Sequence, residues 1–130
     1  MQMAPHAPAN RLVVVIDDDP TILDAMDGLL RSWGYQVVTA ASDEAALARL
    51  AEQQRPDLII SDYHLADGKT GVQAVERLRD AFEIPALIIT GGAMPARPHR
   101  SRPSRYQLMR KPVEPMALQA MLSQLIVGEA

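Results

Sequence analysis

Cysteine is absent from this 130-residue sequence, and histidine is scarce. Without cysteine, the chain can form neither a disulfide framework nor a metal site that depends on thiolates. The three histidines, His6, His64 and His99, lack the spacing of metal ligands. The sequence therefore argues against both cysteine-based and histidine-based metal centres.

Long hydrophobic runs are also missing. No apolar run approaches the roughly 18 residues that a membrane-spanning helix needs. Residues 1–10 contain no lysine or arginine and no apolar core, so we expect no signal peptide there and interpret them as a flexible N-terminal segment or linker. The net charge of −3 argues against nucleic-acid binding. We therefore predict a cytoplasmic protein with one domain over residues 11–127 and no membrane or nucleic-acid partner.

Short apolar runs alternate along the chain with apolar residues at helical spacing. The runs typical of buried strands are residues 12–16, 36–40, 58–61, 86–89 and 106–110. Helical patterns lie near residues 20–33, 42–51, 70–82 and 118–125. Because strands covered on both faces have continuous apolar sequences, this alternation predicts an α/β fold with a parallel sheet.

One segment interrupts the alternation. Between Gly91 and Arg105, where a fourth helix would belong, the chain contains Pro95, Pro98 and Pro103. Each proline inside a helix costs about 3 kcal/mol. The segment is also basic, since no acidic residue occurs between Glu83 and Glu114. We expect residues 93–105 to form an irregular loop, so that the fourth helix is missing or broken.

Chemically active side chains follow four of the predicted strands. They are Asp17 and Asp18, Asp62, Thr90 and Lys111. The carboxyl ends of parallel strands meet at one edge of a sheet, where two carboxylates about 4 Å apart would repel by roughly 4 kcal/mol at an effective dielectric near 20. Mg²⁺ would relieve this repulsion, and lysine and threonine can both contact a phosphoryl oxygen. The pattern indicates metal-assisted phosphoryl transfer onto a carboxylate.

In their order and spacing, these pieces resemble the receiver domain of two-component response regulators over residues 11–127. The matching stretches are Val15-Ile-Asp-Asp-Asp19, Pro56-Asp-Leu-Ile-Ile-Ser-Asp62, Leu87-Ile-Ile-Thr-Gly91 and Lys111-Pro112. The resemblance implies a flavodoxin-like, doubly wound sheet of five parallel strands in the order 2-1-3-4-5. It also implies a cis peptide bond between Lys111 and Pro112.

The resemblance assigns roles to the residues at the strand ends. It implies that Asp62 accepts a phosphoryl group from a histidine kinase or a histidine phosphotransfer domain. Mg²⁺ would be held by four oxygen-bearing groups: Asp17, Asp18, Asp62 and the backbone carbonyl of His64. Lys111 would contact the acyl phosphate, and Thr90 would be the switch hydroxyl. The implied protein is a signalling phosphoacceptor and not an enzyme in the usual sense.

The amino-acid sequence of two stretches resembles one group of receivers in particular. Asp62-Tyr-His-Leu-Ala-Asp-Gly-Lys-Thr-Gly71 and Lys111-Pro-Val113 are similar to the C-terminal receivers of hybrid sensor histidine kinases. Leu108 departs from the family, because many members carry an aromatic switch residue at that position. We therefore expect phosphorylation to change the order or position of the 93–105 loop. This loop and the last helix would contact a downstream protein.

Two other functions use the same residues. Asp17-x-Asp19-x-Thr21 matches the start of haloacid-dehalogenase-type phosphatases, with Thr90 and Lys111 as possible later motifs. Those enzymes need an acidic pair after the lysine, which this chain lacks, and they have no role for Asp62. The second alternative is a receiver fold that acts as an interaction module without phosphorylation. The intact set of acids, threonine and lysine argues against it.

Two charged residues outside this set have plain interpretations. Ser42 is a good helix N-cap, and Asp43 suits the first turn of the helix that follows it. Lys69 is expected to be a solvated loop residue. Neither Asp43 nor Lys69 is assigned to the site.

Overall fold

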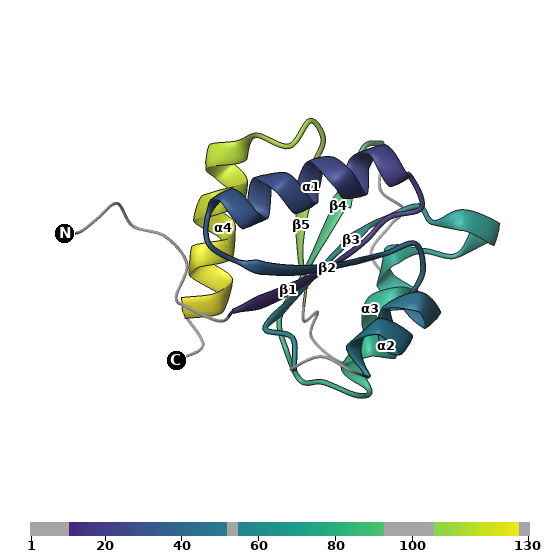
Figure 1. The fold of residues 1–130 in the computed structure, drawn as a ribbon. Coiled ribbons are helices and arrows are strands. Elements are labelled where there is room, and N and C mark those ends of the chain that lie inside the picture. The colour runs from purple at the N-terminus through teal and green to yellow at the C-terminus, as the bar shows by residue number, and fades with distance from the viewer. Residues whose placement is uncertain (1–10, 52–54, 93–105, 128–130) are drawn as a thin grey trace.

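Five parallel strands form a single sheet in the order β2-β1-β3-β4-β5 (Figure 1). The computed structural model describes residues 11–51, 55–92 and 106–127. The strands are β1 (Leu12–Ile16), β2 (Gln36–Ala40), β3 (Leu58–Asp62), β4 (Ala86–Thr90) and β5 (Tyr106–Arg110). All five lie where the apolar runs predicted them, and the predicted flavodoxin-like strand order is confirmed.

Helices cover both faces of the sheet. The first face is covered by α1 (Pro20–Ser32) and α4 (Pro115–Val127), and the second by α2 (Asp43–Leu50) and α3 (Gly71–Arg79), as Figure 1 shows. A short 3₁₀ helix, η1 (Ala66–Gly68), lies in the loop after β3. In the parts of the chain described here, no helix has the length and apolar character needed to cross a membrane.

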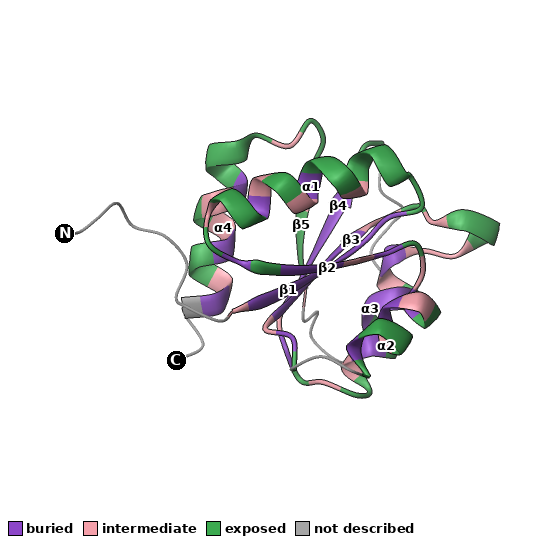
Figure 2. Cartoon of the chain, viewed as in Figure 1, coloured by how far each residue is buried: buried purple, intermediate pink, exposed green. Residues whose placement is uncertain are grey.

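Alternate residues of each central strand enter two different cores. Val14 and Ile59 belong to the core under α2 and α3, whereas Val13 and Ile60 belong to the core under α1 and α4. All four side chains are buried. Because both faces of the sheet exclude water, β1 is apolar at every position, and polar residues occur in β3 and β4 only at their carboxyl ends. Figure 2 shows β1 and β4 as buried along their length.

Helix α1 buries only part of the apolar stripe that its helical spacing predicts. Asp19 caps the helix, and its side chain accepts a hydrogen bond from the Thr21 N–H at 2.9 Å. The deeply buried positions are Met26 and Leu30, while Ile22 is 38% exposed. Helical spacing identifies an apolar stripe, but the crossing of α1 over the sheet decides which part of the stripe is covered.

Strand β5 is an edge strand, and its side chains are half-buried or exposed. Tyr106 packs against the core under α2 and α3, and Met109 packs against the opposite core. Leu108, which the resemblance to receivers places at an aromatic switch position, is 38% exposed. The predicted 93–105 loop and the predicted flexible segment 1–10 lie outside the described residues, so both stay predictions.

Candidate functional site

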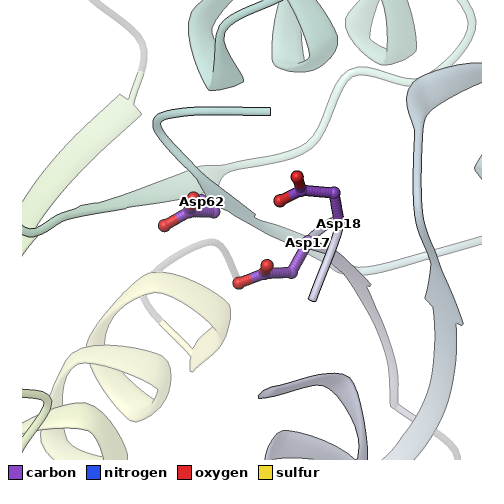
Figure 3. Close-up of side chains that lie close together, drawn as sticks. All are labelled: Asp17, Asp18 and Asp62. Carbon is purple, nitrogen blue, oxygen red and sulfur yellow. The ribbon is translucent and has the colours of Figure 1, made fainter. Parts of the chain in front are cut away.

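Three carboxylates meet at the carboxyl ends of β1 and β3. The two strands pair in parallel, with Ile16 opposite Ser61, so Asp17 follows one strand beside Asp62 at the end of the other. Ligand oxygens of Asp17, Asp18 and Asp62 all lie within 4.8 Å of one another (Figure 3). Asp17 is buried, Asp62 is half-buried and Asp18 is exposed. The structure therefore brings together the acids that the sequence predicted to converge.

Lys111 joins this group from the end of β5, and Thr90 ends the adjacent strand β4. The Lys111 Nζ lies 2.9 Å from the Asp62 Oδ1, and the Lys111 backbone N–H donates to the Thr90 carbonyl oxygen at 2.8 Å. The peptide bond from Lys111 to Pro112 is cis, as the resemblance implied. The Thr90 hydroxyl is buried, and no group in the described part of the chain forms a hydrogen bond with it. An unpaired buried hydroxyl is costly, whereas the role of Thr90 as the switch hydroxyl stays a prediction.

The electrostatics of the site favour a cation. Burial is the main cause that raises the pKa of Asp17, and the charges of Asp62 and Asp18 raise it further. A raised carboxyl pKa means that ionisation of Asp17 costs folding free energy. This cost is absent below its ordinary pKa of 3.8 and complete once the pH exceeds the raised value. Lys111 offsets part of it, and its own pKa is raised chiefly by its hydrogen bond to Asp62.

The donor set suits a hard divalent cation. Mg²⁺ prefers carboxylate oxygens and retains several waters, so it needs few protein ligands. The Asp19 backbone N–H donates to the Asp17 Oδ1 at 2.9 Å and thereby fixes the orientation of this buried carboxylate. The exposed Asp18 leaves one side of the cluster open to solvent. Three carboxylates, one of them exposed, therefore fit a Mg²⁺ ion that keeps some of its water ligands.

The loop after Asp62 is closed by its own backbone. The Gly71 N–H donates to the Tyr63 carbonyl oxygen at 2.6 Å, and the Leu65 N–H donates to the Lys69 carbonyl oxygen at 3.0 Å. His64 and Thr70 form an isolated antiparallel bridge between these two pairs. These backbone pairs fix the conformation of the loop around His64. The role of the His64 carbonyl as a metal ligand stays a prediction.

Gly71 is needed because the backbone of β3 passes directly beside it. A Cβ atom at this position would clash with the carbonyl oxygen of Asp62. We expect Gly71→Ala to destabilise the fold by about 1–3 kcal/mol, the usual cost of overpacking, in urea unfolding. Gly28→Ala is the matched control, since nothing lies within 4 Å of its added Cβ on α1. It should stabilise the helix by about 0.5–1 kcal/mol. Equal effects of the two substitutions would show that the close approach is not a constraint.

One buried charge on α2, linked to the loop after Asp62, was not predicted from the sequence. Asp43 is only 6% exposed, and its carboxylate lies 3.7 Å from the Lys69 Nζ and 3.6 Å from the Arg77 Nη1. The expectation that Lys69 is simply solvated was therefore incomplete, although its side chain stays 43% exposed. No local pattern signals this cluster, because its members come from α2, the loop after β3 and α3.

An apolar cavity of about 600 Å³ opens beside the acids. Its walls include Ile22 and Met26 of α1 together with Pro112 and Val113, and Asp62 also lines it. The exposure of Ile22 follows from its place in this wall. The site thus combines a charged centre with an adjoining apolar surface.

Comparison with known proteins agrees with this geometry. The sequence pattern that defines the response regulator receiver domain matches residues 13–123. The Phyllosphere-induced regulator PhyR of Methylorubrum extorquens is 34% identical over 119 residues, which is 88% of this chain and 43% of that protein. This chain thus spans less than half the length of that relative.

Solved structures give the same result. The solution structure of the Erythrobacter litoralis PhyR receiver domain has a TM-score of 0.76 at 29% identity and covers 92% of each chain. The crystal structure of the anti-anti-sigma factor PhyR from Bartonella quintana has a TM-score of 0.76 at 28% identity, over 94% of this chain and 49% of that one. The chain therefore belongs to the response regulator receiver domains, which are signalling modules of two-component systems and not classical enzymes.

Proposed function

We propose that this receiver domain accepts a phosphoryl group on Asp62 in a Mg²⁺-dependent reaction. The donor would be the phosphohistidine of a histidine kinase or of a histidine phosphotransfer domain. The observation that carries this proposal is the convergence of Asp17, Asp18 and Asp62, with the Lys111 Nζ 2.9 Å from the Asp62 carboxylate. Three acids and one ammonium group at the end of a buried sheet serve stability poorly and suit phosphoryl transfer well.

The reaction needs one bond to form and one to break. An oxygen of Asp62 forms a bond to phosphorus while the phosphorus–nitrogen bond of the donor breaks, and its electron pair returns to the imidazole. Asp17, Asp18, Asp62 and the carbonyl of His64 would hold Mg²⁺, which supplies positive charge to the phosphoryl oxygens when bound. Lys111 already contacts the accepting carboxylate and can contact a phosphoryl oxygen after transfer.

The surroundings of Asp62 support a protein as the physiological donor. The apolar cavity beside it, with walls from α1 and the segment after β5, offers burial to apolar side chains of a partner. A small phosphodonor has no use for such a surface. Ile22, 38% exposed in this wall, would be covered when the donor binds.

Labelling with acetyl phosphate tests the assignment. In the presence of Mg²⁺ we expect an acid-stable, base-labile adduct that is lost in Asp62→Asn and on removal of Mg²⁺ with a chelator. Asp67→Asn is the matched control, because Asp67 is exposed in the same loop and its backbone φ of 61° is one that asparagine tolerates. This control should be labelled like the wild type. A full-strength adduct in Asp62→Asn would refute the assignment.

The output of the domain belongs to the same proposal. One solved relative, PhyR from Bartonella quintana, is described as an anti-anti-sigma factor, so we propose a protein as the downstream partner of this chain. Its contact surface would be α4 with residues 93–105, and the functional unit would be residues 11–127. A receiver fold that acts without phosphorylation is the alternative, and complete absence of the adduct in the wild type would favour it. A haloacid-dehalogenase-type phosphatase is not favoured, because the family match over residues 13–123 is to receiver domains.

A further inference from the structure

Asp43 is a buried acid with partners on two other elements. It is the first residue of α2, and its side chain is 8% exposed. Its two oxygens face different cations, with Lys69 Nζ 3.7 Å from Oδ1 and Arg77 Nη1 3.6 Å from Oδ2. Acids are rarely buried to this degree unless they are paired. The Asp43 carboxylate is thus buried, whereas the side chains of Lys69 and Arg77 that pair with it are both about half-exposed.

Lys69 connects this anchor to the loop that follows the phosphoacceptor. The Lys69 backbone accepts a hydrogen bond from the Leu65 N–H and donates one to the Ala66 carbonyl oxygen at 3.2 Å. Leu65 is the next residue after His64, and Thr70, the next after Lys69, forms the bridge with His64. A displacement of Lys69 would therefore be transmitted through these backbone pairs to the segment beside Asp62.

We propose that Asp43 is a positioning residue for the Mg²⁺ site. Its carboxylate holds the Lys69 ammonium group, and Lys69 holds residues 63–70 in the conformation that presents the backbone of His64 to the metal. Asp43 does not contact the metal or the phosphoryl group in this scheme. The inference rests on the proposed function, because it concerns the loop that follows Asp62.

A long-range effect of charge and a positioning role predict different Mg²⁺ affinities for variants of Asp43 and Lys69. If only long-range charge mattered, Asp43→Asn would weaken Mg²⁺ binding by removing a negative charge. Lys69→Met would then strengthen it by removing a positive charge. Positioning requires both variants to weaken binding, because each breaks the same contact.

Calorimetric titration with Mg²⁺ is the test, on the wild type, Asp43→Asn, Lys69→Met and the double variant. We expect each single variant to raise the Kd by about threefold to tenfold, below the about 10- to 100-fold effect of groups that contact a metal ligand directly. The double variant should show no more than the larger single effect, because the two residues share the Asp43–Lys69 contact. The second acidic partner of Lys69, Glu44 at 3.9 Å, is exposed and holds the ammonium group less firmly. Glu76→Gln, an exposed acid on α3, is the control for net charge and should change the Kd by less than about twofold.

Hydrogen exchange in metal-free buffer gives a second readout that does not depend on the metal. The amides of Leu65 and Lys69 should exchange faster in Asp43→Asn than in the wild type, while amides of β1 stay protected. Tighter Mg²⁺ binding by Lys69→Met, or an unchanged Kd in Asp43→Asn, would overturn the positioning role while leaving the proposed function intact. Absence of Mg²⁺ binding by the wild type would overturn both.

Discussion

Replacement of Asp18 by asparagine is expected to abolish Mg²⁺ binding without loss of stability in metal-free buffer. The ligand oxygens of the three acids lie within 4.8 Å of one another, so each carboxylate repels the other two. Asp18 is the exposed member, and among the described residues its carboxylate has no hydrogen-bond or salt-bridge partner. The apo protein should therefore be as stable as the wild type or more stable by up to about 1 kcal/mol, the scale of exposed charge interactions.

Two measurements on one preparation test this expectation. Calorimetric titration should show no Mg²⁺ binding by Asp18→Asn, and urea unfolding should show an equal or higher free energy of unfolding. Asp24→Asn removes the same charge from an exposed position on α1 and should keep the wild-type Mg²⁺ affinity. Clear destabilisation of Asp18→Asn would mean that the carboxylate has a structural partner in solution. Unchanged Mg²⁺ binding would remove Asp18 from the metal site.

Much of this fold is readable in the sequence because its sheet is buried on both faces. The apolar runs at residues 12–16 and 86–89 have few alternatives to a central strand, and the structure places β1 and β4 there. The convergence of Asp17 and Asp62 follows from topology alone, since the carboxyl ends of neighbouring parallel strands meet at one edge. The resemblance to receivers added what topology does not supply, above all the cis bond before Pro112.

Contacts between side chains of distant elements are what the sequence does not show. Asp43 is ordinary as a first-turn acid, and its burial results from the packing of α2 beside α3 and the loop after β3. Likewise, the spacing of Ile22 and Met26 on α1 is the same whether the helix covers both or only one. Local patterns identify the faces of elements, whereas crossing angles and loop paths decide which residues of a face meet a neighbour.

The apolar cavity is a third feature that arises only from assembly. Its walls come from α1 and from the segment after β5, which are far apart in the sequence. Apolar residues in both places are expected to fill a core, and the sequence gives no reason to leave them partly open. The structure leaves this space next to Asp62, the residue at which we propose that a phosphodonor protein docks.

Replacement of Thr90 by valine is expected to stabilise the metal-free protein, whereas loss of a paired buried hydroxyl usually destabilises a fold. Thr90 is 1% exposed, and its hydroxyl has no hydrogen-bond partner in the described residues. A buried hydroxyl without a partner costs about 1–3 kcal/mol. Valine has nearly the same shape without the hydroxyl, so Thr90→Val should raise the free energy of unfolding of the metal-free protein by about 1 kcal/mol.

The same substitution should lower the gain in stability that a phosphoryl mimic provides. If Thr90 is the switch hydroxyl, it finds an acceptor when Asp62 carries beryllofluoride in the presence of Mg²⁺. The wild type should then gain about 1–2 kcal/mol more stability from the mimic than Thr90→Val does, because only threonine forms the new hydrogen bond. Urea unfolding with and without beryllofluoride measures both quantities.

A buried hydroxyl on another strand, that of Ser61 in β3, supplies the control. Ser61 is fully buried, and its Oγ donates to the Asp62 carbonyl oxygen at 3.0 Å. Since this hydroxyl has its partner already, Ser61→Ala should destabilise the metal-free protein by about 1 kcal/mol. If Thr90→Val destabilises the metal-free protein as Ser61→Ala does, the Thr90 hydroxyl is paired in solution before phosphorylation. It would then have no hydrogen bond to gain, and the switch would have to depend on the movement of another group.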